Sequence, residues 1–236
     1  ANEHDGKCSW ISTACPSVVE LVRKYYPEAV NRLAKVPSPL QTHWAYLRSI
    51  YGNDIGIVFI GPCIAKKNEA DTTPGYPDIA ITFDELRSWL KEERIDLDSI
   101  DTSNKVAFAP AKAGIATLYP VERGQIVTSK IWGEKPFCRD ALALSGVNEI
   151  HDVLAQGRDN DPFLELLGCE GGCINGPVSD KCKSLAVRKN AIAQFTESRI
   201  SSGEKLFEPK EEFVREVLDK GYSILGGSQP ASDTTF

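Results

Sequence analysis

The sequence predicts an α/β fold, in which sheets are covered by helices. Short apolar runs bounded by Gly and Pro alternate with helical patterns along the chain, and this alternation is typical of that class. The 236 residues are 42% hydrophobic, and a chain of this length buries roughly 70–75% of the surface that its unfolded form exposes. No apolar run reaches the ~20 residues of a membrane helix, so no membrane partner is expected.

The charge pattern argues against a nucleic-acid partner. The chain has 27 Lys and Arg residues and 33 Asp and Glu residues, which gives a formal net charge of −6. The basic residues are scattered, with only short pairs such as Lys66 and Lys67, so the chain offers no basic stripe to phosphates. The first fifteen residues are polar and lack the apolar core of a signal peptide, and a cytoplasmic location is therefore expected.

The first half of the chain is predicted to contain helices around short strands. Residues 17–26 show an apolar helical face, and Pro16 stands at the first helical position, where its missing N–H costs nothing. Residues 56–61 (GIVFIG) are predicted as a buried strand and 78–83 (DIAITF) as a second, because both runs are short, continuous and rich in Ile. Residues 83–95 then repeat apolar residues at a helical spacing.

The second half continues the alternation. Three further strands are predicted, over residues 105–110, 125–132 and 140–145. Residues 147–156 follow Gly146 as a short amphipathic helix, and 163–167 (FLELL) form the last apolar run before a turn rich in Gly and Cys. Two more helices are predicted, over residues 184–198 with Ser184 as the cap, and over 209–221.

Seven cysteines carry the strongest chemical signal. In a chain of this length without a secretion signal, thiols are more often free, catalytic or metal-bound than paired in disulfides. Four of them lie in three loops, each at the end of an apolar element: Cys15, Cys63, Cys169 and Cys173. The chain also contains no Met, even at position 1, which predicts a processed chain or a piece of a longer one.

Three loops that offer thiols to one point suit a soft metal centre. A cubane iron–sulfur cluster takes four thiolates, and Gly171 and Gly172 are expected to let the chain wrap closely and aim N–H groups at sulfur. Zinc is the competing metal, but its structural sites usually use closely spaced Cys or His pairs, whereas Cys15 and Cys63 are 48 residues apart. Spacing alone leaves both a metal site and ordinary buried thiols open.

At these residues the chain resembles the FeFe hydrogenase large-subunit family, in its C-terminal H-cluster domain. Three signature loops match in order: residues 12–16 resemble the family's TSCCP loop, 62–69 (PCIAKKNE) its PCxxKxxE loop, and 169–176 (CEGGCING) its CPGGCxxGG loop. Residues 38–41 (SPLQ) also resemble a family segment. The match spans about residues 9–190, most of the chain.

The resemblance implies two helix-covered sheet lobes with the metal site in the cleft between them. It further implies that the upstream part of one lobe is missing from this sequence. Residues 1–120 would form the first part, with the Cys15 and Cys63 loops, and 121–200 the second, with the remaining loop. Residues 201–236 would add a C-terminal helix and tail.

The resemblance also implies a cofactor and a reaction. Cys15, Cys63, Cys169 and Cys173 would ligate a 4Fe-4S cluster. Cys173 would also bridge to a two-iron unit that carries CO, cyanide and a dithiolate, which completes the H-cluster. Lys66 would donate a hydrogen bond to one cyanide, and Glu69 would lie on the proton path or instead cap a helix. The reaction would be reversible H2 oxidation and proton reduction, with electrons from a ferredoxin-like carrier or an attached ferredoxin domain.

Departures from the family pattern weaken the expectation of fast catalysis. The proton-relay Cys of the family is here Ala14, and a methyl group cannot carry a proton. This resembles the sensory branch of the family, so slow turnover or H2 sensing with attached signalling modules is expected. The alternatives are a non-catalytic 4Fe-4S protein of the same fold, for cluster assembly or redox sensing, or an apo fragment. Cys8, Cys138 and Cys182 match none of the loops and are interpreted as structural or incidental.

Overall fold

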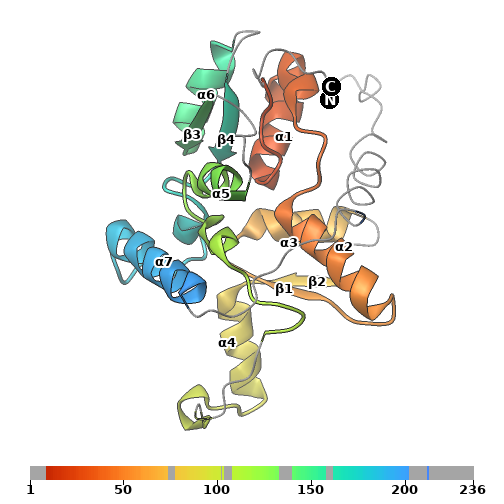
Figure 1. Cartoon of the computed structure of the whole chain (residues 1–236), viewed down its shortest axis with the longest axis vertical. Helices are drawn as coiled ribbons and strands as arrows, with labels where there is room; N and C mark the ends of the chain where they lie inside the picture. The colour runs from red at the N-terminus through yellow and green to blue at the C-terminus, as the bar shows by residue number, and fades with distance from the viewer. Residues whose placement is uncertain are drawn as a thin grey trace.

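The computed structural model describes residues 9–73, 78–101, 103, 108–132, 140–157, 162–201 and 212. Within these ranges, α-helices surround two small parallel sheets (Figure 1). The predicted α/β class is confirmed. The helices are α1 (Pro16–Tyr25), α2 (Pro39–Tyr51), α3 (Ile64–Thr72), α4 (Phe83–Glu92), α5 (Gly124–Trp132), α6 (Val147–Ala155) and α7 (Leu185–Ile200). The strands are β1 (Val58–Ile60), β2 (Ile79–Ile81), β3 (Ala141–Ser145) and β4 (Phe163–Leu167).

The better-buried sheet pairs β3 with β4 in parallel. Ala141 lies opposite Phe163 at one end, and Ser145 lies opposite Leu167 at the other. All five residues of β4 are buried, because α1 packs against this strand while α6 contacts β3. The main hydrophobic core lies here, with fully or almost fully buried side chains at Ile11, Val18, Val22, Ile150, Leu164 and Leu166.

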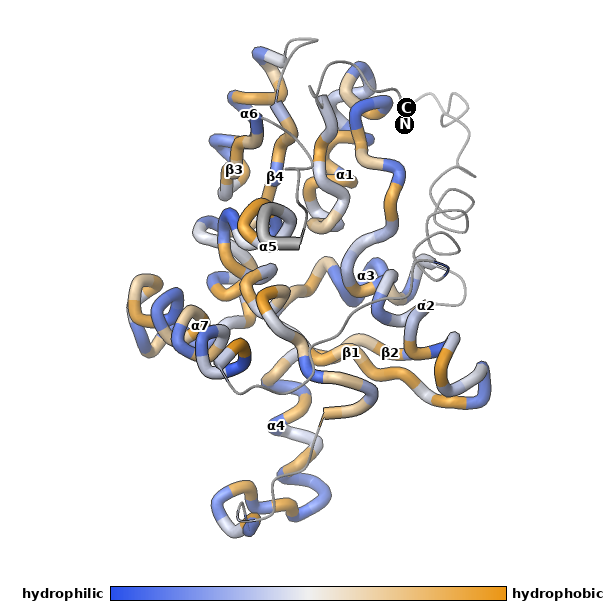
Figure 2. Tube along the Cα trace, in the orientation of Figure 1, coloured by the Kyte–Doolittle hydropathy of each residue, from blue (hydrophilic) through white to orange (hydrophobic). Residues whose placement is uncertain are grey.

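The other sheet pairs β1 with β2 in parallel and is much more exposed. Both strands are predicted from the sequence, but the expectation that the first is buried is wrong: Val58 is 45% exposed and Ile79 is 49% exposed. Alternate side chains of a strand point to opposite faces, and α3 packs against this sheet. Figure 2 shows the hydrophobic residues along both strands.

The prediction of a strand over residues 125–132 is also wrong, because this segment is helix α5. Ile126, Val127 and Thr128 are β-branched and favour a strand locally. A long-range contact favours the helix instead. The buried carboxylate of Glu165 in β4 accepts hydrogen bonds from the N–H groups of Gln125 (3.4 Å) and Ile126 (2.9 Å). A negative charge at a helix N-terminus stabilises the helix by about 0.3–1 kcal/mol, and by up to ~2 kcal/mol when partly buried.

Helices α1, α4, α6 and α7 begin where the sequence predicts, whereas α2 and α3 are not among the predicted helices. Pro16 opens α1, and Ser184 caps α7 through the Val187 N–H (3.4 Å). Helix α4 starts with a capping box, in which Thr82 and Glu85 satisfy each other's backbone N–H groups. The predicted helix over 209–221 lies outside the described residues except for residue 212. Of the strand predicted over 105–110, residues 105–107 lie outside them, and the described residues 108–110 do not form a strand.

Candidate metal centre

Two of the four predicted sulfur ligands cap helices. Cys15 is the N-cap residue of α1 and Cys63 that of α3, both with extended backbone. The free N–H groups and the dipole at such a helix end favour negative charge, and they lower the cost of a thiolate. Both thiols are therefore placed where a metal-bound sulfur is stabilised.

The loop that contains Cys169 and Cys173 contacts both of the other cysteine loops. The Gly168 N–H donates to Cys15 Sγ at 3.5 Å, so the start of this loop touches the Cys15 loop. At the other end, a Cβ on Gly176 would lie 2.6 Å from the Pro62 carbonyl oxygen, beside Cys63. Segments more than 100 residues apart in the sequence therefore meet at one place.

The four thiols lie close enough to interact electrostatically in every pair. Burial raises the pKa of Cys173 to about 12, helped by the neighbouring Cys15, Cys63 and Cys169. Burial likewise raises the pKa values of Cys63 and Cys169, and neighbouring thiols add to both increases. Without a metal, the raised pKa values favour the protonated thiols of Cys63, Cys169 and Cys173, whereas a bound metal centre displaces the protons.

The spacing of these sulfur atoms is not that of a single-ion site. Among the residues that the structure describes, no three His, Cys, Asp or Glu side chains converge as ligands of one metal ion. Zinc requires such a tight tetrahedron. A cubane instead presents four separate iron atoms, one to each thiolate, so its ligands stand further apart.

The two glycines between Cys169 and Cys173 shape the third loop. Gly171 and Gly172 have φ values of +76° and +102°, which favour glycine. A Cβ on Gly172 would also lie 2.4 Å from the Pro120 carbonyl oxygen. The close wrapping expected from the sequence is present, but their N–H groups do not point at sulfur: they donate to Ser145 Oγ (2.8 Å) and to the Cys169 carbonyl (2.9 Å).

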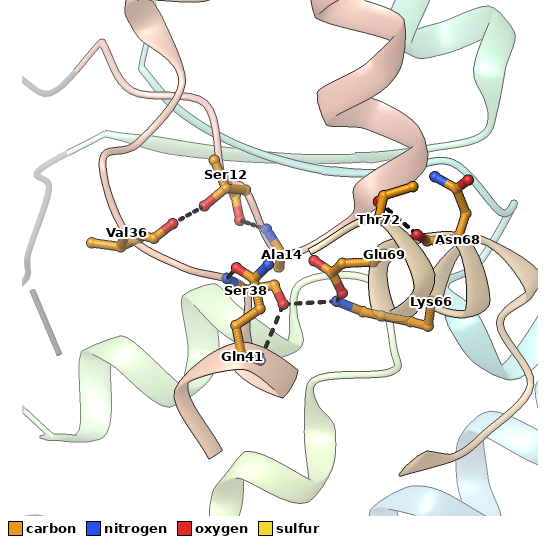
Figure 3. A network of polar contacts seen from close by, with 10 residues as sticks. Ser12, Ala14, Val36, Ser38, Gln41, Lys66, Asn68, Glu69 and Thr72 are labelled. Atoms are coloured by element: carbon orange, nitrogen blue, oxygen red, sulfur yellow. Dashed lines mark hydrogen bonds and ion pairs between the residues drawn. The ribbon is translucent and has the colours of Figure 1, made fainter. Parts of the chain in front are cut away.

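Lys66 is a buried cation with two partners in the described structure. It is 8% exposed, and its Nζ donates to Ser38 Oγ at 2.9 Å and to Glu69 Oε2 at 2.5 Å (Figure 3). An ammonium group carries three donors. Within the described ranges these contacts use two of them, which leaves one N–H for a ligand. The Lys66 charge also acts on Cys63 and Cys173, so the ammonium lies near the sulfur atoms.

Ser38 is a part of this site that the sequence reasoning missed as a functional residue. It is 2% exposed and caps α2 in a capping box with Gln41 while it also accepts from Lys66. The pattern of Ser followed three residues later by Gln predicts the cap. No local pattern predicts the contact with a lysine 28 residues away.

Glu165 was also missed, and it is almost fully buried, with 1% exposed. Burial raises the pKa of this carboxyl group, while the N–H groups of Ile126 and Gln125 oppose the increase. The nearby Gln125 side chain accepts from Ser12 Oγ at 2.6 Å, which ties the Cys15 loop to α5. The signal in the sequence is the lone acid in the apolar run FLELL.

The remaining predicted residues fall outside this group or beside it. Ala14 directly precedes Cys15, and its N–H donates to Ser12 Oγ at 3.2 Å (Figure 3). Cys182 is exposed, and Cys8 and Cys138 lie outside the described residues. No helix in the described part of the chain is long and apolar enough to cross a membrane.

Two bacterial hydrogenases are similar to this chain over much of its length. "Iron hydrogenase 1" of Clostridium pasteurianum is 24% identical over 220 residues, which cover 74% of this chain and 38% of that protein. The "Periplasmic [Fe] hydrogenase large subunit" of Nitratidesulfovibrio vulgaris is 24% identical over 211 residues, or 70% of this chain and 50% of that protein. The chain thus spans between 38% and 50% of the length of these relatives.

Solved structures show the same fold. The E141A variant of the [FeFe]-hydrogenase HydA1 from Chlamydomonas reinhardtii superposes with a TM-score of 0.57 at 17% identity, over 90% of this chain and 71% of that one. Residues 2–134, with the Cys15 and Cys63 loops, match the family described as "Iron only hydrogenase large subunit, C-terminal domain". Since that match covers more than half of the 236 residues, this chain belongs to the family of C-terminal domains of iron-only hydrogenase large subunits.

Proposed function

We propose that this chain binds an H-cluster. Cys15, Cys63, Cys169 and Cys173 would hold its 4Fe-4S part, and Cys173 would also bridge to the two-iron unit with CO, cyanide and dithiolate ligands. The observation that carries the proposal is the meeting of four thiols from three loops, each within electrostatic reach of the others. Thiolates are the ligands that iron–sulfur clusters select.

The surroundings of the thiols fit such a group. A cluster with four thiolates carries net negative charge, and the N-termini of α1 and α3 offer partial positive charge at Cys15 and Cys63. The Lys66 ammonium adds a full positive charge nearby. When bound, the group would supply the redox chemistry of H2 splitting and formation, while the protein supplies orientation and protons.

Lys66 and Glu69 would be the functional side chains around the cofactor. Lys66 has one N–H left for a cyanide nitrogen, and Ser38 and Glu69 keep the ammonium group in place. Glu69 Oε2 lies 2.5 Å from Lys66 Nζ, next to the proposed cofactor ligand, and we place this carboxylate on the proposed proton path. Ala14 offers no atom that could relay a proton further.

The missing relay group supports a slow enzyme or an H2 sensor. Proton transfer by a positioned side chain contributes roughly 10²–10⁴-fold to a rate, so its loss limits turnover without removing binding of H2. We propose H2 and protons as substrates, a ferredoxin-like carrier or attached ferredoxin domain as the source of electrons, and signalling modules as further partners.

Infrared spectroscopy of anaerobically matured protein tests the proposal. CO and cyanide stretching bands and about six iron atoms per chain are expected. Cys173→Ser should remove the bands, whereas Cys182→Ser should keep them, because Cys182 is exposed and is not one of the four proposed ligands.

The same measurement separates the alternatives. About four iron atoms without these bands would indicate a non-catalytic 4Fe-4S protein, for cluster assembly or redox sensing. Ala14 favours that outcome, whereas Lys66, which a protein that holds only the 4Fe-4S cluster does not need, speaks against it. A colourless, folded protein without iron would indicate an apo form and would contradict both iron-binding functions.

A further inference from the structure

Asn175 ties together both ends of the Cys169–Cys173 loop. Its side-chain Nδ2 donates to the Glu170 carbonyl at 2.9 Å, which lies next to Cys169. Its Oδ1 accepts from Arg188 Nη2 at 2.8 Å and from Lys181 Nζ at 3.0 Å. One amide thus links the start of the loop, its end and two cations.

Arg188 connects this loop to helix α7. Its Nη1 donates to the Ile174 carbonyl at 2.6 Å, and its Nε donates to the Lys183 carbonyl at 3.1 Å. A guanidinium group has a rigid, planar set of donors, so three such bonds fix the loop and the chain before α7 in one relative position. Lys181 adds a bond from Nζ to the Asn175 carbonyl at 2.9 Å.

The hydrogen bonds of Arg188 and Lys181 do not neutralise these two cations. Their hydrogen-bond acceptors here are neutral, and neither forms an ion pair in the described part of the chain. Asp180 interacts with Arg188 electrostatically, but it is exposed and accepts the Cys182 N–H at 2.8 Å. The Arg188 guanidinium is bonded to the carbonyl of Ile174, directly after Cys173, and the Lys181 ammonium to that of Asn175, two residues after it, so both charges lie at the end of the ligand loop.

We propose that Asn175, Arg188 and Lys181 form a clamp that holds the Cys169–Cys173 loop in its ligating shape and places two positive charges next to the end of this loop, at the carbonyl groups that follow Cys173. The inference about charge rests on the proposed function, because it concerns the bound cluster. Nearby cations stabilise the more negative, reduced form of an iron–sulfur cluster and so raise its reduction potential. Arg188 is half-buried and Lys181 exposed, so screening by water and salt weakens the effect of Lys181.

Hydrogen exchange of the metal-free protein tests the positioning role. In Asn175→Ala and Arg188→Gln, amides of residues 170–176 should exchange at least tenfold faster than in the wild type, while those of α1 stay unchanged. Arg199→Gln is the control, because it removes the same charge from the same helix, where its guanidinium stacks on the rings of Phe108 and Phe195. Equal exchange in the wild type and both clamp variants would overturn the clamp.

The reduction potential of the reconstituted 4Fe-4S cluster, followed by EPR with redox mediators, tests the role of the charge. Arg188→Gln should lower the ratio of reduced to oxidised cluster tenfold at a fixed potential, a shift of about 59 mV for one electron. Lys181→Gln should shift the potential in the same direction but less, because water and salt screen this exposed charge. Arg188→Lys should keep the reduction potential, because it retains the positive charge. The amides of residues 170–176 should still exchange faster, because lysine lacks the planar set of guanidinium donors.

These outcomes separate the two proposals. A wild-type protein that takes up no iron refutes the proposed function and the charge role together, and hydrogen exchange still decides the clamp. A wild-type protein that binds the cluster, with the same potential in Arg188→Gln, refutes only the charge role.

Discussion

Replacing Glu69 by Gln tests whether Lys66 is a buried cation that depends on one carboxylate. The two side chains are each 11% exposed, with Lys66 Nζ 2.5 Å from Glu69 Oε2. Removing one partner of a buried ion pair costs about 3–5 kcal/mol, because the remaining charge has neither its counter-charge nor full access to water. Ser38 stays as an acceptor, and the pair is not completely buried, so we expect a loss near the lower end, about 3 kcal/mol.

The next lysine along the chain provides a matched control. Lys67 pairs with Glu85, but these side chains are 35% and 48% exposed. Exposed ion pairs are worth about 0–1 kcal/mol, so Lys67→Gln should change the free energy of unfolding by less than about 1 kcal/mol. The two variants remove similar ion pairs that differ mainly in burial.

Urea unfolding of the metal-free protein, followed by circular dichroism, measures the difference. With a slope of about 1–3 kcal/mol per M, a loss of about 3 kcal/mol lowers the unfolding midpoint by roughly 1–3 M. Adding Lys66→Met to Glu69→Gln should recover much of the loss, because no buried charge remains. A midpoint shift in Glu69→Gln no larger than that in Lys67→Gln would refute the reasoning, since water would then already reach the ammonium group.

Three further predictions concern other parts of the site. Because burial raises the pKa of Glu165, the folded chain holds this proton to higher pH than the unfolded chain. Stability should therefore fall as pH rises from about 4.3 through the raised value, and Glu165→Gln should flatten this part of the curve in urea unfolding. Gly172→Ala places a Cβ 2.4 Å from the Pro120 carbonyl oxygen, at a φ of +102°. The urea midpoint of this variant should fall by the equivalent of at least about 1–3 kcal/mol of backbone strain. Gly56→Ala is the control and should leave the midpoint almost unchanged, because no atom beyond its chain neighbours lies within 4 Å of its Cβ. In matured protein, Ala14→Cys should raise H2 turnover by roughly 10²-fold or more, and an unchanged rate would count against a proton route through Glu69.

The local signals in the sequence predicted where most described helices begin. Proline at the first turn of α1, the cap at Ser184 and the acidic first turn of α4 act through neighbours within four residues. Short Ile-rich and Leu-rich runs likewise indicated β1, β2 and β3. Such signals are readable because each involves a few consecutive residues.

The failures in the fold involve partners far away in the sequence. The β-branched residues of α5 favour a strand, whereas the carboxylate of Glu165, about 40 residues later, stabilises the first turn of a helix. The burial of β1 also could not be read from its composition, because exposure depends on which elements cover each face.

The same division holds at the candidate metal centre. The identity and order of Cys15, Cys63, Cys169 and Cys173, and the offsets of Lys66 and Glu69, are properties of the sequence alone, and through them the family and the type of ligand could be inferred. Tertiary structure decided that these thiols meet, that Ser38 and Glu69 share the ammonium group of Lys66, and that Arg188 of α7 donates a hydrogen bond to the loop that contains Cys169 and Cys173. The physical reason is that hydrogen bonds, burial and electrostatic interactions depend on the distance between groups in space, and the separation of two residues along the chain does not determine this distance.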